Sequence, residues 1–85
     1  MKKKETPIEL DLHGNLVEEA IPKIEDFLYN AYRAGFDRVW IIHGKGTGVL
    51  KLEVSRLLSR HSLVRSFYNA DKYHGGEGAT QVNLV

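Results

Sequence analysis

Hydrophobic positions near the start of the chain change from a period of two to a period of three or four. Residues 8–12 alternate apolar and polar side chains, which is typical of a half-buried strand. From Val17 onwards the apolar side chains form one helical stripe, and Gly35 supplies a left-handed stop. We therefore predict a strand followed by an amphipathic helix. Pro22 removes a backbone donor inside that helix, so we expect a bent or late first turn.

The rest of the chain repeats this alternation and then adds two strands. Residues 38–42 form a nearly continuous β-branched and aromatic run, as in a strand covered on at least one face. A second helical stripe covers 50–61, and the segments 63–69 and 79–85 have strand character on either side of a glycine-rich loop at 71–78. We predict a two-layer α/β (α+β) sandwich of the β-α-β-α-β-β type. Its four-stranded mixed sheet has both helices on one face.

Parallel crossovers would bring the ends of the first two strands to one edge of the sheet. Asp11 and His13 end the first strand and His43 follows the second, so we expect them to lie close together. Ligands of open α/β sheets bind at this carboxyl edge. The sheet face without helices carries Asp11, Trp40 or Ile42 and part of the last two strands, and it could be open to a partner.

Length and composition limit the chain to one domain. With 85 residues it has room for one core, and we predict a disordered basic tail over 1–7 and a single domain over 8–85. The absence of cysteine excludes disulfides and thiolate zinc sites. No apolar run could span a bilayer, and no signal peptide is apparent, so we expect a cytoplasmic protein with no membrane partner. A monomer is the default for the isolated domain, and the sequence leaves the oligomeric state open.

The charge is small overall but unevenly distributed. The net charge is +1, yet residues 43–85 carry six Lys or Arg against three acids, whereas residues 1–42 carry six against eight. A polyanion is therefore expected to meet the second half of the chain.

The segment HGKGTG, residues 43–48, lies between the second strand and the second helix. Its glycines allow backbone amides to converge on an oxyanion, and the lysine and the helix start add positive charge. The pattern matches neither a Walker A motif nor a dinucleotide fingerprint, so ATP and NAD are poor candidates. The alternative is a tight turn with no ligand. The candidate phosphate-binding residues are Gly44, Lys45, Gly46, Thr47, Gly48, Lys51 and Arg65.

The segment LDLHG, residues 10–14, supplies candidate catalytic groups. Asp11 and His13 are two residues apart and project to one face, where a carboxylate beside an imidazole can act as a general base or bind a metal. With His43 they form the candidate catalytic set. We expect no tightly bound cofactor, although Mg²⁺ or Mn²⁺ could bind at Asp11 and His13. The alternative is a surface Asp11 and a His13 that caps the next helix.

Three further residues have simpler interpretations. His61 is expected to be a surface residue at the end of the second helix. His74 lies in a loop that could close over the same edge or form a flexible hairpin. Trp40 could stack a base, but inside a β-branched run it is expected in the core.

Three ordered motifs resemble those of the small MutS-related (Smr) domain. They are LDLHG before VEEA, then IIHGKGTGVLK, then GGEGATQVNL, and together they cover Leu10 to Leu84. The resemblance implies a fold similar to the C-terminal domain of a bacterial translation initiation factor. Members of this family occur alone or as the C-terminal domain of MutS-type ATPases implicated in suppressing recombination and rescuing collided ribosomes. Several members nick DNA or cleave RNA.

The resemblance implies roles for particular residues. The first family motif falls on Asp11, His13 and Gly14, and the second falls on residues 43–46 and 48. Some relatives have Arg in place of the first histidine, so His13 could bind phosphate instead of transferring a proton. Leu16 stands where a Thr cap is frequent.

We therefore expect a nucleic-acid-binding domain with endonuclease activity, which nicks DNA or cleaves RNA. The first alternative is a non-catalytic module that docks on RNA or the ribosome through the same turn. A purely structural or dimerising domain is the other alternative.

Overall fold

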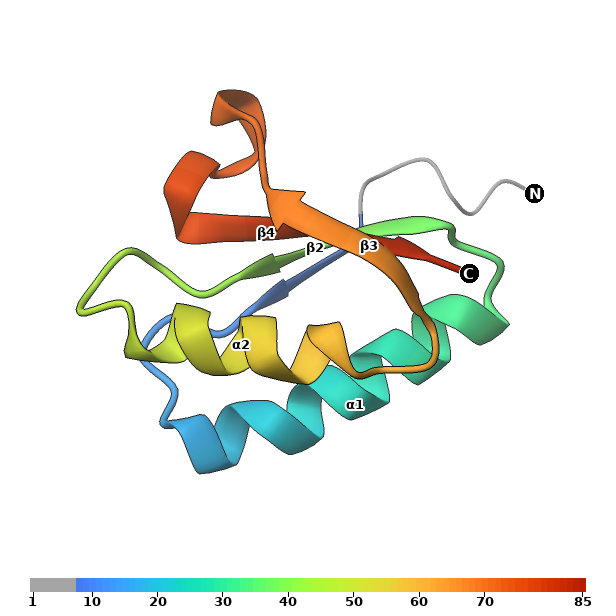
Figure 1. Ribbon diagram of the computed structural model, residues 1–85, viewed down its shortest axis with the longest axis horizontal. Coiled ribbons are helices and arrows are strands. Elements are labelled where there is room, and N and C mark those ends of the chain that lie inside the picture. The colour runs from blue at the N-terminus through green and yellow to red at the C-terminus, as the bar shows by residue number, and fades with distance from the viewer. Residues whose placement is uncertain (1–7) are drawn as a thin grey trace.

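The computed structural model describes residues 8–85, and the predicted tail at 1–7 lies outside the described residues. The elements are β1 (Ile8–Asp11), α1 (Val17–Arg33), β2 (Arg38–Ile42), α2 (Val49–Ser59), β3 (Val64–Asn69) and β4 (Ala79–Leu84), with short 3-10 helices η1 (Lys72–His74) and η2 (Gly76–Gly78) before β4 (Figure 1). The strands lie in the order β1-β2-β4-β3. β1 is parallel to β2, and β4 is antiparallel to both β2 and β3. The predicted two-layer fold with a mixed sheet is confirmed.

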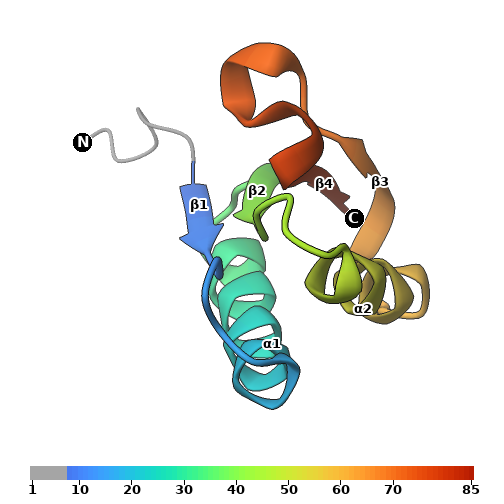
Figure 2. The same cartoon turned by 90° about the vertical axis from the view of Figure 1, so that its left-hand side faces the viewer.

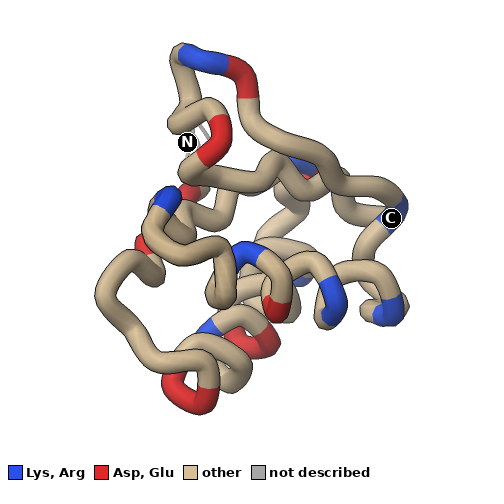
Figure 3. The backbone as a smooth tube through the Cα atoms, turned by 60° about the vertical axis from the view of Figure 1, so that its left-hand side comes forward, with Lys and Arg blue, Asp and Glu red and all other residues tan. Residues whose placement is uncertain are grey.

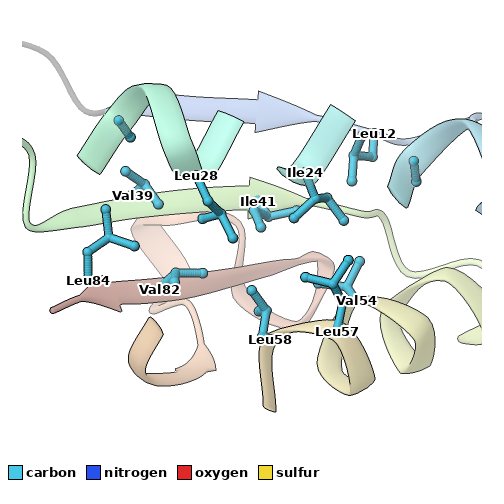
Figure 4. Packing of buried hydrophobic residues seen from close by; sticks show 12 residues of the cluster. Leu12, Ile24, Leu28, Val39, Ile41, Val54, Leu57, Leu58, Val82 and Leu84 are labelled. Atoms are coloured by element: carbon cyan, nitrogen blue, oxygen red, sulfur yellow. The ribbon is translucent and has the colours of Figure 1, made fainter. Parts of the chain in front are cut away.

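Both helices cover the same face of the sheet (Figures 1 and 2). Their buried side chains recur every three or four residues, so each helix presents an apolar stripe to the alternating apolar positions of the strands. The core is shown in Figure 4 and consists of Leu12, Ala20, Ile24, Leu28, Ala31, Val39, Ile41, Val54, Leu57, Leu58, Val82 and Leu84. No helix within residues 8–85 is long and apolar enough to cross a membrane.

Helix α1 begins at Val17, five residues before its proline, so the expected late start is wrong. The missing amide of Pro22 leaves the carbonyl of Glu18 without its helical partner. Both residues are exposed, so water can solvate that carbonyl. At the start of the helix, Leu16 offers no side-chain cap, but its amide donates to Glu19 Oε1 at 2.9 Å.

Three connections meet at the carboxyl edge of β1 and β2. The last residues of these strands, Asp11 and Ile42, are in register, and the amide of Leu12 donates to the carbonyl of Ile42 at 2.7 Å. β4 begins opposite Ile42 with Ala79. Figure 2 looks onto this edge and shows the loops after β1, after β2 and before β4 coming together.

The sheet face away from the helices is partly covered by the loop that contains η1 and η2. Trp40 is 6% exposed and packs with Ala70 and Ala79 in a second, smaller cluster. The ring of His74 stacks on Trp40, with centroids 4.8 Å apart and planes 13° from parallel. Trp40 is therefore a core residue, as predicted, and the loop is held down over one end of this face.

Candidate functional site

Asp11 and His13 form a hydrogen-bonded pair at the end of β1. Asp11 Oδ1 accepts from the backbone amide of His13 at 3.1 Å and from its Nδ1 at 2.8 Å. These bonds place a proton on Nδ1 and leave Nε2 without a partner within residues 8–85. The hydrogen bond to Asp11 raises the pKa of His13, and the same bond lowers the pKa of Asp11. The pair is open to solvent, with 73% of the His13 side chain exposed.

His43 occupies a different environment, because it is only 5% exposed. Its Nδ1 lies 2.9 Å from the carbonyl oxygen of Gly44, which can only accept, so this nitrogen carries the proton. Nε2 then accepts from Thr80 Oγ1 at 2.9 Å. Burial lowers the pKa of His43, which favours this neutral form. The structure thus gives His43 a place in holding the turn, not the open position expected for a residue that exchanges protons with a substrate.

The turn at 43–48 depends on glycine for its path. Gly44, Gly46 and Gly48 have φ values of 79°, 23° and 87°, and Gly48 is the N-cap of α2. Within the described residues, the amides of Gly46 and Gly48 have no hydrogen-bond partner. Unpaired amides at a helix start are suited to an anion. The turn borders a shallow cavity of about 180 Å³ lined by Gly14, Asn15, His43, Gly44, Lys45, Gly46, Thr47, Gly48, Leu50 and Lys51.

The turns that carry His13 and Lys45 lie against each other, as the parallel crossover predicts. A β-carbon added to Gly44 would lie 3.5 Å from Cβ of His13. The third connection supports the turn from the other side, because the carbonyl of Gly78 accepts from the amides of His43 at 3.0 Å and Gly44 at 2.9 Å. A β-carbon on Gly78 would lie 3.6 Å from Lys45 Cγ. The exposed pair and the glycine turn therefore share one edge.

Arg65, the other candidate for binding nucleic acid, does not lie at this edge. β3 runs parallel to β2, and the first residues of both strands lie at the opposite end of the sheet. Arg65 lines a separate pocket there, together with Arg38 and Asn83. Lys51, by contrast, lies beside the turn as expected.

Within residues 8–85, no group of three or more His, Cys, Asp or Glu side chains is placed to hold a metal ion. Asp11 and His13 offer two donor side chains, and His43 is occupied by its own hydrogen bonds. A divalent ion at this edge would therefore need ligands from water or from the bound molecule.

The other histidines also have defined partners. His61 Nε2 lies 2.8 Å from Glu25 Oε1, and its Nδ1 accepts from the amide of Leu63 at 3.1 Å. Its side chain is only 13% exposed and links the two helices, so the expectation of a surface residue is wrong. His74 Nδ1 lies 2.8 Å from Asp71 Oδ1.

Sequence reasoning did not single out the contributions of Thr80 and Gly78. Thr80 lies 37 residues from His43 in sequence, and no local pattern connects the two. The GGEG segment predicts a turn, but nothing in its sequence indicates that the carbonyl of Gly78 supports the 43–48 turn. These contacts appear only once β4 is placed beside β2.

The Smr domain family matches this chain over residues 10–85, and the chain belongs to that family. It is similar to the protein named Endonuclease MutS2 of Pelotomaculum thermopropionicum, with 46% identity over 84 residues. That alignment covers 99% of this chain but 11% of the relative, so the chain spans a small part of the length of the curated relatives it matches. The putative endonuclease MutS2 of Bacillus subtilis is 46% identical over 77 residues, covering 91% of this chain and 10% of that protein.

Solved structures agree with this membership. The Smr domain of Thermus thermophilus MutS2 superposes with a TM-score of 0.88 at 37% identity, covering 92% of this chain and 98% of that one. YdaL, a stand-alone small MutS-related protein from Escherichia coli, superposes with a TM-score of 0.86 at 33% identity, covering 89% of this chain and 63% of YdaL.

Proposed function

We propose that this Smr domain binds the phosphate backbone of a nucleic acid at the 43–48 turn and cleaves a phosphodiester bond there. The observation that carries the proposal is the approach of His13 to Gly44, which sets an exposed Asp–His pair against an anion-binding turn. Relatives with the printed name Endonuclease MutS2 support the nuclease assignment.

Binding uses the turn and the first turn of α2. The free amides of Gly46 and Gly48 donate to phosphate oxygens, and the ammonium groups of Lys45 and Lys51, which line the same cavity, add positive charge. Binding neutralises phosphates and releases counterions, so affinity falls steeply as salt is raised.

Cleavage uses His13 as the group that transfers protons. Neutral His13 accepts a proton at Nε2 from the attacking oxygen, which is water or the 2′-hydroxyl of RNA. This oxygen forms a bond to phosphorus, the bond from phosphorus to the leaving oxygen breaks, and the proton passes from Nε2 to that oxygen. Asp11 fixes the ring and stabilises its charged form, while Lys45 and the turn amides stabilise charge that develops on the phosphoryl oxygens.

The test is turnover by highly purified domain on supercoiled plasmid and on structured RNA. Each substrate is incubated with EDTA, with Mg²⁺ and with Mn²⁺, which also tests the metal requirement. The double substitution Asp11→Ala and His13→Ala should abolish cleavage and leave the circular dichroism spectrum unchanged. Asp26→Ala, on the exposed side of α1, is the control and should cleave normally. Full activity in the double variant would remove the catalytic assignment.

A second candidate is a module that docks on RNA or the ribosome without cleaving it. The burial of His43 favours it, because His13 is then the single open imidazole beside the turn. This candidate predicts the same salt-dependent binding and its loss in Lys45→Ala. It predicts no cleavage of either substrate under any of the metal conditions.

A further inference from the structure

We infer that this domain holds its nucleic acid as an extended single strand along β3, with unpaired bases on Tyr68 and a phosphate at Arg38 and Arg65. The inference rests on the proposed nucleic-acid function and adds a second binding region at the far end of the sheet from the 43–48 turn. It names the form of the substrate, which the turn alone does not determine.

The pocket at the far end places two guanidinium groups and one carboxylate around one cavity. It measures about 350 Å³ and is lined by Asp37, Arg38, Arg65, Asn83 and Leu84. The pairing of β3 with β4 is irregular between Val64 and Ser66, and a bulge of this kind redirects the side chain of the extra residue, here Arg65. Within residues 8–85 neither guanidinium forms an ion pair, and that of Arg38 lies 5.6 Å from the ring centroid of Trp40. Two unpaired guanidinium groups beside one cavity match the geometry of a phosphate.

Tyr68 lies between this pocket and the loop before β4. It is in register with Gln81, so it projects from the sheet face opposite the helices, and it is 53% exposed. Its hydroxyl accepts from Gln81 Nε2 at 2.9 Å, which fixes the ring on the sheet. The same face continues with Gln81 Nε2 donating to Asn83 Oδ1 at 3.1 Å, and with Asn83 Nδ2 donating to Ser66 Oγ at 3.0 Å. This row of amides and hydroxyls borders an aromatic ring that a base can stack on.

The loop after β3 continues the same combination of positive charge and aromatic surface. Tyr73 is 82% exposed, and Lys72 Nζ lies 5.4 Å from its ring centroid. The end of this loop, at Gly78, packs against Lys45. A path therefore runs from the Arg38 and Arg65 pocket, past Tyr68 and Tyr73, to the 43–48 turn. β3 has six residues, so this path extends along roughly 20 Å of strand, at about 3.3 Å per residue.

A single strand fits this surface better than a duplex does. Unpaired bases can unstack from adjacent bases and stack on exposed tyrosines, whereas the bases of a duplex are already stacked on each other. Figure 3 shows both basic and acidic positions along the backbone, in keeping with the net charge of +1, so overall charge does not select a duplex.

The experiment measures binding of fluorescein-labelled oligo-dT and oligo-U of about 12 nucleotides by fluorescence anisotropy. The two oligonucleotides distinguish DNA from RNA, and a labelled duplex of mixed sequence is measured beside them. Tyr68→Ala should raise the Kd for a single strand at least about fivefold and leave the Kd for the duplex unchanged. Tyr68→Phe keeps the ring and should bind within about twofold of the parent. Tyr29→Ala is the matched control, because Tyr29 is also 53% exposed but lies on α1.

The basic end of the path has its own measurement. Arg65→Ala should reduce the slope of log Kd against log salt concentration by about one, because one phosphate fewer is neutralised. Arg60→Ala, at the end of α2, should not change the slope. Thermal melts establish that each variant is folded, and Tyr68→Phe keeps the proposal testable if Tyr68→Ala unfolds.

The outcomes separate this inference from the proposed function. Loss of binding in Lys45→Ala with no effect of Tyr68→Ala or Arg65→Ala would overturn the single-strand path and leave the turn as the binding site. An equal loss of single-strand and duplex binding in Tyr68→Ala would also overturn it. If the parent domain binds no oligonucleotide, the proposed function fails together with the inference.

Discussion

The ring of His43 is joined to the hydroxyl of Thr80, with Nε2 and Oγ1 2.9 Å apart. This bond ties the end of β2 to β4 and orients the ring whose other nitrogen donates to the carbonyl of Gly44. The 43–48 turn is therefore held by a buried side-chain hydrogen bond and by the carbonyl of Gly78.

The bond between His43 and Thr80 should contribute measurably to stability. Thr80→Val keeps the shape but removes the donor, which leaves Nε2 of a buried imidazole unpaired and should lower the free energy of unfolding by about 1–3 kcal/mol. Urea denaturation gives this value. Thr80→Ser retains the hydroxyl and should therefore lose less stability. An unchanged urea midpoint in Thr80→Val would contradict the role assigned to the bond.

Burial of His43 predicts a pH dependence of stability. Its pKa is lowered in the folded state, so as pH falls below about 6.5 the unfolded chain takes up a proton first and the free energy of unfolding falls. The pKa of His13 is raised in the folded state, so His13 contributes stability that is lost as pH rises through this raised pKa. This contribution has the opposite sign to that of His43, and it is smaller because His13 is exposed. Urea denaturation between about pH 5 and pH 7.5 should show that the free energy of unfolding falls as the pH is lowered. His43→Gln should make this dependence on pH weaker. A parent protein that is more stable at the acidic end would contradict this assignment.

The pKa of His13 should depend on its carboxylate partner. Asp11→Asn removes both the charge and the strongest acceptor for Nδ1, so the pKa of His13 should fall towards the ordinary histidine value. The ring Hε1 resonance, followed by NMR as pH is varied, measures this change. An unchanged pKa of His13 in Asp11→Asn would contradict the role assigned to this hydrogen bond.

Two adjacent glycines in the loop before β4 should respond differently to alanine. A β-carbon at Gly75, where φ is 110°, would lie 2.7 Å from Cβ of Ala79, so the loop must move and its hold on the 43–48 turn should weaken. Gly76 has φ of 55° and nothing within 4 Å of the added carbon, so its substitution carries the backbone strain alone, about 1 kcal/mol. Thermal melts should therefore place Gly75→Ala clearly below Gly76→Ala. Equal midpoints would show that the loop does not need this close approach.

Much of the fold could be predicted because its signals are local. Alternation in β1, the run in β2 and the helical stripes each determine an element from neighbouring residues, and the parallel crossover then places Asp11 and His13 beside the turn after β2. The surroundings of His43 could not be predicted in the same way, since its partner Thr80 lies in β4. The position of Arg65 could not be predicted either, because it depends on the direction of β3 and on the irregular pairing between Val64 and Ser66.

Titration of isotopically labelled domain with a short single-stranded oligonucleotide, followed by NMR, tests most directly that His13 and the glycine turn form one site. The amide resonances of Gly46 and Gly48 and the ring resonance of His13 should shift together, with a common Kd. Lys45→Ala should weaken that Kd, whereas Arg60→Ala should not. If Gly46, Gly48 and His13 stay unchanged while other resonances shift to saturation, the nucleic acid binds elsewhere, and His13 and the turn are not its binding site.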